Sequence, residues 1–111
     1  MIAKTPIPPY YAVIFTSLRT NVKGNYSETS ELMDDLAQQQ EGFLGVESVR
    51  NNLGITVSYW SDLDSIKKWK ENKEHALARE RGRNEWYTHF KTRIAKVERD
   101  YEFEKESPSL D

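Results

Sequence analysis

The sequence contains no cysteine and no long apolar run. The lack of cysteine excludes disulfides, thiolate catalysis and thiolate metal sites, and it fits a reducing compartment. The first residues, MIAKTPIPPYY, do not form the continuous apolar segment of a signal peptide. Nowhere does the chain offer the roughly 20 consecutive apolar residues that span a bilayer. We therefore expect a soluble, cytoplasmic protein without a membrane partner.

Several chemical signatures are also missing. Gly42, Gly45 and Gly54 belong neither to a GxGxxG motif nor to a phosphate-binding loop, so we expect no nucleotide cofactor. There is no GxSxG motif, which argues against a serine hydrolase. Two histidines without HExxH spacing do not make a zinc site, so we expect no metal.

The charge balance argues against a general nucleic-acid binder. The formal charge is −2 and the pI is about 5.7, whereas tracking a phosphate backbone needs a net basic field. Twelve of the 16 Lys and Arg residues nevertheless lie between Lys67 and Lys105. This flank could meet an anionic group locally, although a solvated helix face is the commoner explanation.

A chain of 111 residues has the size of one domain with a thin core. We place that domain at residues 10–103, after an extended, proline-containing arm at 1–9 and before a polar, flexible tail at 104–111. The run YYAVIFTSL at 10–18 is rich in aromatic and β-branched residues, which predicts a first strand covered on both faces.

Two helices and a hairpin are predicted next. Asn25 and Glu28 resemble a capping box, which predicts a helix that begins there and ends near Gly42. The runs at 42–50 and 54–60 are strand-like and are separated by NNLG, which is typical of a hairpin turn. Ser61 with Asp64 then predicts the cap of a second helix, on which Trp69 closes the buried stripe.

The C-terminal part predicts a further helix at 73–81 and a last strand at 93–103, in RIAKVERDYEF. The order strand, helix, two strands, one or two helices, strand favours an α+β fold. We expect a ferredoxin-like, four-stranded antiparallel sheet with its helices on one face.

Two groups of residues are candidates for function. His75 and Arg79, at i and i+4, would share a helix face and could set an acid/base group beside a fixed cation, although such a histidine is more often structural. The aromatic residues could line a pocket for a flat ligand, although each one is more often core. They are Phe15, Phe43, Tyr59, Trp60, Trp69, Trp86 and Tyr87.

The strings GFLGVESVR, YWSDLDSIKKWKENKEHALARERGRNEWY and RIAKVERDY resemble the antibiotic biosynthesis monooxygenase domain family over about residues 10–103. The resemblance implies a dimeric α/β barrel, in which the sheets of two copies pair across a two-fold axis. It also implies a ligand held between helices and sheet. Trp69, His75 and Arg79 would face that cleft, with Phe15, Phe43 and Tyr59 as wall residues.

The family's activities set the hypotheses. Members oxygenate aromatic compounds without metal or flavin, and another branch degrades haem. We expect a homodimeric, cofactor-independent monooxygenase that acts on a small aromatic or quinone-like molecule, with His75 or Tyr59 as base and Arg79 stabilising an oxyanion. Ligand contacts are assigned to Trp69, Phe15, Phe43, Trp60 and Trp86, although Trp60 could equally pack under the second helix or at the dimer interface.

Two alternatives stay open. The first is a haem-binding, haem-degrading enzyme with His75 as the iron ligand and Arg79 or nearby lysines at the propionates. The haem-degrading relatives have an asparagine on the first strand that AVIFTS lacks, and Arg79 follows His75 one turn later, so haem ranks second. The other alternative is a non-enzymatic module that binds a small ligand.

Overall fold

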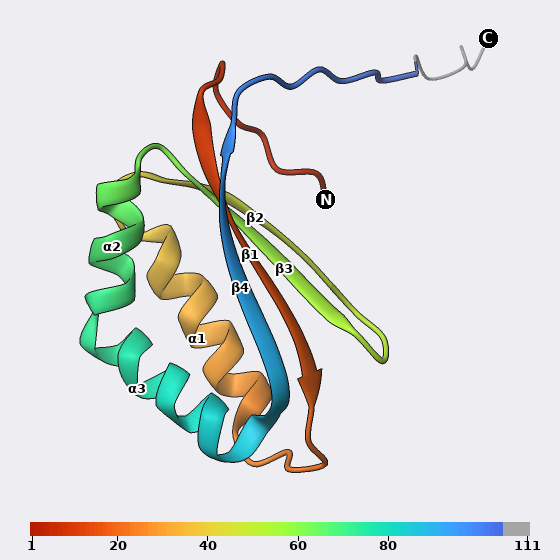
Figure 1. Cartoon of the computed structure of the whole chain (residues 1–111), viewed down its shortest axis with the longest axis vertical. Helices are drawn as coiled ribbons and strands as arrows, with labels where there is room; N and C mark the ends of the chain where they lie inside the picture. Colours follow the sequence, from red (N-terminus) through yellow and green to blue (C-terminus); the bar gives the residue numbers. More distant parts are fainter. Residues whose placement is uncertain (106–111) are drawn as a thin grey trace, which may run out of the picture.

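The chain folds into one antiparallel sheet with its helices on one side (Figure 1). The computed structural model describes residues 1–105. The strand order is β2-β3-β1-β4, which confirms the predicted ferredoxin-like α+β fold. The elements are β1 (Tyr10–Arg19), α1 (Tyr26–Gln38), β2 (Phe43–Arg50), β3 (Gly54–Trp60), α2 (Leu63–Glu71), α3 (Lys73–Arg81), the π-helical turn η1 (Gly82–Trp86) and β4 (Tyr87–Val97).

The strand register assigns every sheet residue to one of two faces. The ring of Trp60 stacks on Trp69 of α2, so Trp60 lies on the helix-covered face. Its neighbour Tyr59 lies on the opposite, open face, because side chains alternate along a strand. Phe15 pairs with Thr56, four residues before Trp60, and therefore shares the helix-covered face.

The core is thin, as the length predicts. The buried apolar side chains include Trp60 at 0% exposure and Trp86 at 3%. Ile66 of α2 and Ala37 of α1 are buried as well. Ala12 is buried on the open face. Each of the two buried tryptophans closes one end of the helix-covered face, and they fix where α2 and η1 sit.

The predicted capping interactions are both wrong, although α1 does begin after Asn25. Asn25 precedes α1 but has φ 58°, a left-handed conformation, and its side chain makes no capping bond. An N-cap needs an extended residue to turn its side chain toward the first amides, and Asn25 is not extended. The cap of α2 is Asp62, whose carboxylate accepts from the Ser65 amide at 2.7 Å, while the Ser61 hydroxyl donates to Asp62.

The last strand was predicted too far along the chain. β4 spans Tyr87–Val97 because it pairs with β1 over the whole length of β1, from Arg19 to Tyr10. Beyond Tyr10 the preceding prolines have no amide hydrogen to extend the ladder, so pairing stops at Val97. Tyr101 and Phe103, predicted to lie on that strand, are 96% and 88% exposed.

The two ends of the chain behave differently. The N-terminal arm lies against the open face, where the Ala3 amide donates to Glu47 at 2.8 Å (Figure 1). Residues 98–105 leave the sheet without strand pairing, and 106–111, most of the predicted tail, lie outside the described residues. No helix within residues 1–105 has the length and apolarity needed to cross a membrane.

Candidate functional site

The corner between α2 and α3 positions His75. Asn72 ends α2 and caps α3. Its side-chain oxygen accepts from the amides of Glu74 at 3.0 Å and His75 at 3.2 Å. Because Asn72 satisfies amides at the start of α3, the chain turns sharply and carries the His75 side chain back toward α2.

The imidazole of His75 is held on two sides. Its ring stacks on Trp69 with centroids 4.2 Å apart and planes 11° apart, and Nδ1 lies 2.9 Å from the Trp69 carbonyl oxygen. A carbonyl oxygen only accepts, so Nδ1 carries the proton and Nε2 keeps its lone pair. Burial lowers the pKa of His75, the carbonyl of Trp69 opposes that shift, and Arg79 adds to it. His75 is therefore a neutral base at pH 7.

Arg79 lies on the same inward face of α3, one turn after His75. Its Nη2 donates to the Lys70 carbonyl at 3.0 Å. Its Nε is buried and has no acceptor within the described chain. A buried unpaired donor costs roughly 1 to 3 kcal/mol, so Nε marks a place where a ligand oxygen would be stabilised.

His75 and Arg79 also have a structural role. The carbonyls of Trp69 and Lys70 belong to the last turn of α2, where the Trp69 carbonyl also accepts from the amide of Asn72, the residue that ends the helix, at 3.1 Å. One donor from each side chain binds one of these carbonyls. The predicted pair is therefore held at one corner, and Nε2 of His75 and Nε of Arg79 take no part in these bonds.

The predicted ligand-binding aromatics divide into two clusters. Phe43, Trp60, Trp69 and His75 form the tryptophan cluster, with Phe43 5.3 Å from Trp60 edge to face and Trp60 6.2 Å from Trp69. This cluster covers the end of the sheet below α2. The indole NH of Trp60 donates to Ser58 at 2.9 Å, so this fully buried ring is satisfied.

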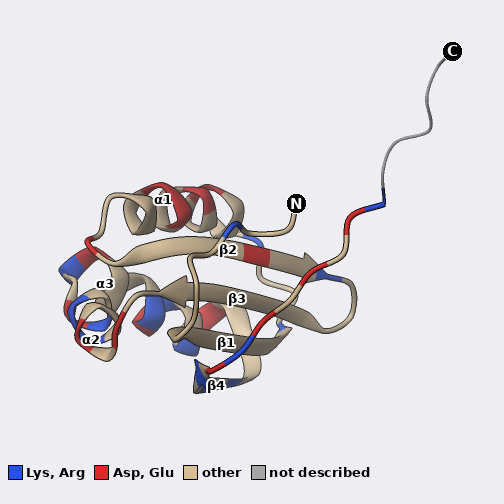
Figure 2. Cartoon of the chain, turned by 90° about the horizontal axis from the view of Figure 1, so that it is seen from above, with Lys and Arg blue, Asp and Glu red and all other residues tan. Residues whose placement is uncertain are grey.

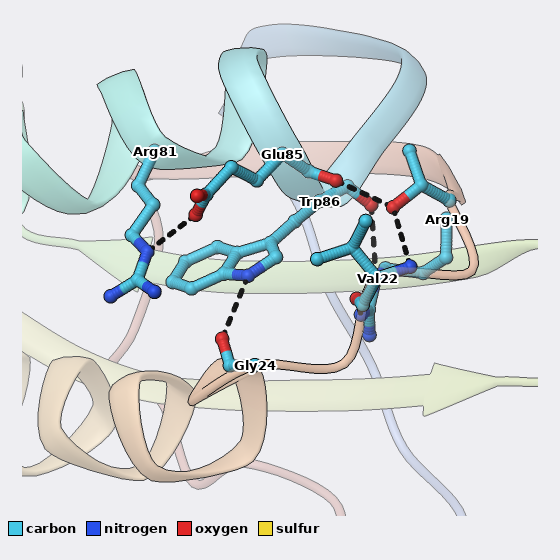
Figure 3. A network of polar contacts seen from close by, with 7 residues as sticks. Arg19, Val22, Gly24, Arg81, Glu85 and Trp86 are labelled. Atoms are coloured by element: carbon cyan, nitrogen blue, oxygen red, sulfur yellow. Dashed lines mark hydrogen bonds and ion pairs between the residues drawn. The ribbon is translucent and has the colours of Figure 1, made fainter.

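The second group, the tyrosine cluster, lies at the other end of the same face. Phe15 meets Tyr87 at 5.3 Å and Phe90 at 5.4 Å, and Tyr26 meets Trp86 at 5.4 Å. Figure 3 shows Trp86 donating its indole NH to the Gly24 carbonyl, at 3.2 Å. The structure thus separates Phe15 and Trp86 from the other predicted ligand contacts.

Tyr59 is separated from His75 by the sheet. On the open face its hydroxyl donates to Glu47 at 2.6 Å, and its ring meets Tyr10 edge to face at 5.9 Å. Burial, with the bond to Glu47, raises the pKa of Tyr59 to about 12. The bond from Tyr59 in turn lowers the pKa of Glu47. Tyr59 therefore cannot act on the same atom as His75.

Two hollows on the described surface lie away from His75. One, of about 280 Å³, is lined by α3 and η1 residues that include Leu77, Arg81 and Glu85. The other, of about 360 Å³, lies between the arm and the C-terminal segment, at Ile7 and Tyr101. Neither hollow borders the tryptophan cluster. A ligand that binds at the tryptophan cluster would therefore have to displace side chains of the α2–α3 corner.

Charge is unevenly spread over the helices (Figure 2). α1 carries Glu28, Glu31, Asp34 and Asp35 and no Lys or Arg, whereas α2 and α3 hold both signs. Burial, with the neighbouring Asp35 and Glu31, raises the pKa of Asp34. Two ion pairs form within residues 1–105, Lys68 with Asp64 and Arg81 with Glu85, so most of the surface charge there is unpaired.

A sequence relative identifies the family. YqjZ of Bacillus subtilis, an uncharacterized protein, is 50% identical to this chain over 106 residues, which cover 94% of this chain and 93% of YqjZ. The chain belongs to the YqjZ family. No protein-family model matches this YqjZ-family chain.

Solved structures confirm the predicted resemblance at the level of the fold. SnoaB, a cofactor-independent oxygenase from Streptomyces nogalater, superposes in a mutant form with a TM-score of 0.70 at 9% identity, over 82% of this chain and 95% of SnoaB. A proposed antibiotic biosynthesis monooxygenase from Nitrosomonas europaea gives 0.68 at 11% identity, over 85% and 94%. Rv0793 of Mycobacterium tuberculosis gives 0.68 at 8%, over 84% and 97%. The YqjZ-family chain thus has the antibiotic biosynthesis monooxygenase fold.

A single nitrogen of this YqjZ-family site could ligate haem iron. One face of the His75 ring is covered by Trp69, and Nδ1 is bound, which leaves Nε2 as the one nitrogen for iron. The next inward side chain, Arg79, offers only N–H donors and so does not ligate a metal. Within residues 1–105 there is also no group of three or more His, Cys, Asp or Glu that could hold an ion.

Sequence reasoning missed two sets of residues in the YqjZ-family chain. Arg50 reaches Ser17 from the hairpin end, and Arg19 lies over the Tyr26 ring at 3.4 Å. On the open face Tyr10 donates to Asp100, 90 residues away. Tertiary packing brings these partners together, so no local pattern could have found them.

Proposed function

We propose that the protein is a monooxygenase that needs no added cofactor and acts on a small aromatic or quinone-like substrate. The observation that supports this is the α2–α3 corner, where a neutral His75 with a free Nε2 lies one helical turn from Arg79 with an unpaired, buried Nε. The likeness in fold to SnoaB, a cofactor-independent oxygenase, agrees with this chemistry.

The proposed reaction begins with proton transfer to His75. Nε2 removes a proton from a CH₂ that is conjugated with an aromatic ketone, and Arg79 stabilises the enolate oxygen. The enolate gives electrons to dioxygen and forms a hydroperoxide at that carbon. Loss of water then leaves a carbonyl: R₂CH₂ + O₂ gives R₂C=O + H₂O. The substrate supplies both electrons that reduce the second oxygen atom.

Tyr59 is not included in this site, because its hydroxyl donates to Glu47 on the opposite face of the sheet. Trp69 would border the ligand through the edge of its indole, since one face already packs on His75. Phe43 and Trp60 would support Trp69 from below.

The test uses a tricyclic anthrone in air. We expect oxygen uptake matched by formation of the quinone, with one ¹⁸O atom from ¹⁸O₂ in the new carbonyl. His75→Phe keeps the stack on Trp69 and should lower turnover at least a hundredfold, the usual contribution of a general base. Arg79→Gln should lower it as well.

Matched controls separate chemistry from folding. His89→Gln and Arg83→Gln change an exposed histidine and an exposed arginine and should keep full activity. Near-ultraviolet circular dichroism of Trp69 reports whether the corner survives each change. Full activity of folded His75→Phe and Arg79→Gln would exclude this site from the reaction.

Haem is tested in parallel by stepwise addition with the Soret band recorded. We expect no saturable band at one haem per protomer. A saturable band that decays with ascorbate in air would replace the anthrone chemistry with haem degradation. Tight binding of an aromatic ligand without any turnover would favour a binding module.

The protein is further proposed to be a homodimer through its open sheet face. Ile14 and Val57 at the centre of that face stay half-buried, Leu18 is 40% exposed and Val49 is 69% exposed. A second copy would cover these side chains, and an isologous contact needs only one such surface.

Light scattering after gel filtration tests the dimer. Val49→Glu should shift the protein toward monomer. Leu77→Glu, at a site of α3 that is 67% exposed but away from this face, should leave the mass unchanged. A monomeric wild-type protein would refute the dimer and leave the corner chemistry untouched.

A further inference from the structure

Two arginines meet neutral partners at the hairpin end of the helix-covered face. Arg50 donates through Nη2 to the Ser17 hydroxyl and through Nη1 to the Ser17 carbonyl at 3.5 Å. Ser17 is 2% exposed, so its hydroxyl is a fixed anchor. Gly54 makes room for the guanidinium, since a Cβ there would lie 2.1 Å from Nη2 of Arg50. Arg50 is therefore held in one place.

Arg19 is held in the same way. Nε donates to the Trp86 carbonyl at 3.0 Å and Nη2 to the Val22 carbonyl at 2.8 Å. Its carbon Cζ lies 3.4 Å from the centroid of the Tyr26 ring. All of these partners are neutral.

No carboxylate neutralises either cation within residues 1–105. The ion pairs formed there are those of Lys68 and Arg81. Burial and the bond to Tyr26 raise the pKa of the Tyr87 hydroxyl. The positive charges of Arg50 and Arg19 oppose this shift and lower that pKa. Arg50 is bound to Ser17, and Arg19 follows Ser17 by two residues on β1, so two fixed positive charges lie at this end of the face without a counter-ion from the described chain.

Hydroxyls and rings complete this end of the face. The Tyr87 hydroxyl donates to that of Tyr26 at 3.3 Å, which leaves the Tyr26 proton free to donate onward. Ser48 and Thr56 share a hydrogen bond of 3.0 Å on the sheet beside Phe15. Ser48 and Arg50 are exposed, whereas Phe15, Phe90 and Thr56 are half-buried, so the surface is accessible.

We propose that this surface binds a small aromatic carboxylate. The carboxylate accepts from the guanidinium of Arg50, Arg19 adds positive potential, and the ring lies against Phe15 and Phe90. Ser17 and Phe15 are two residues apart on β1, about 6.6 Å, which matches the length of a one-ring acid. Arginine is suited to this role because its planar fork pairs with both carboxylate oxygens.

The site goes beyond the proposed oxygenase. Trp60, at the His75 end, pairs with Tyr11, six residues before Ser17 on β1. The two ends of the face are therefore about 20 Å apart, too far for a one-ring acid to touch both. Benzoate binding and anthrone turnover can accordingly fail or succeed separately.

The experiment titrates the whole chain with benzoate and follows amide and arginine Nε–H signals by NMR. Benzoate should shift the signals of Arg50 and its neighbours. Arg50→Gln should weaken binding at least tenfold, and Gly54→Ala, which pushes the guanidinium aside without changing charge, should weaken it too. Arg93→Gln, a control on the open face of β4, should leave the dissociation constant unchanged.

Two neutral or simpler probes sharpen the result. Benzamide has the same ring without the charge and should bind at least tenfold more weakly. Inorganic phosphate has charge without a ring and should also bind more weakly than benzoate. The proposal is overturned if benzoate shifts no signals there, if Arg50→Gln binds as well as wild type, or if either probe matches benzoate.

Discussion

Gly42→Ala should destabilise the protein strongly, for two independent reasons. Gly42 has φ 85°, and a residue with a Cβ pays about 1 to 2 kcal/mol in that left-handed region. An ideal Cβ would also lie 2.1 Å from Oγ and 2.6 Å from Cβ of Ser65, and 2.8 Å from Oγ of Ser61. Such overpacking costs about 1 to 3 kcal/mol. The expected loss is therefore about 2 to 5 kcal/mol of unfolding free energy.

This substitution also tests how the candidate site is positioned. The Gly42 carbonyl accepts from the Ser61 amide at 2.8 Å, which holds the end of β3 and the start of α2 against the turn before β2. Pushing Ser65 away would move α2 relative to the sheet. We therefore expect the near-ultraviolet signal of the stacked Trp60 and Trp69 to change along with stability.

Urea unfolding of Gly42→Ala beside Gly24→Ala is the assay. Gly24 has no atom within 4 Å of its ideal Cβ and no positive φ, so alanine there should be neutral or stabilise by up to about 1 kcal/mol. Adding Ser65→Gly to Gly42→Ala removes the nearest atoms and should cost less than the sum of the single changes. Equal midpoints for the two alanine variants would refute the reasoning.

Three further predictions concern the two faces of the sheet. Because burial lowers the pKa of His75 below 6.5, the unfolded chain binds more protons between the lowered and the ordinary value. The unfolding free energy should thus fall as pH drops through that window. His75→Phe should reduce this pH dependence of the urea midpoint, whereas His89→Gln should leave it in place. Asn72→Ala removes the cap of α3 and should lower the unfolding free energy by about 1 kcal/mol in urea. An unchanged unfolding free energy would show that this cap does not stabilise α3. Tyr59→Phe should raise the pKa of Glu47 in a carboxyl NMR titration, and an unchanged titration would mean that their bond is absent in solution.

The element order could be predicted because it depends on local pattern. Strand runs at 10–18, 42–50 and 54–60 are each rich in β-branched or aromatic residues, and the structure places strands at all three. The predicted caps failed because a cap depends on backbone conformation as well as residue type: Asn25 is left-handed, and the N-cap of α2 is the extended Asp62, whose carboxylate accepts from the Ser65 amide.

The strand end and the site needed tertiary information. β4 ends at Val97 because its partner strand β1 begins at Tyr10, and alternation along 93–103 gives no sign of this limit. His75 and Arg79 could be paired from their i, i+4 spacing on α3. Tyr59 could have been separated from Trp60 by strand alternation, but only the contact of Trp60 with Trp69 shows which face the helices cover.

The structural and chemical roles of the α2–α3 corner do not compete for the same atoms. Nδ1 of His75 and Nη2 of Arg79 hold the end of α2, while Nε2 of His75 and Nε of Arg79 make no bond that the fold requires. A marginally stable domain gains nothing from a buried, unpaired donor. A ligand oxygen bound at Nε would recover that cost, and the bond would strengthen as negative charge develops on that oxygen. Under the proposed function, this nitrogen would stabilise a charged intermediate more than a neutral ground state, and that difference is what the proposed catalysis requires.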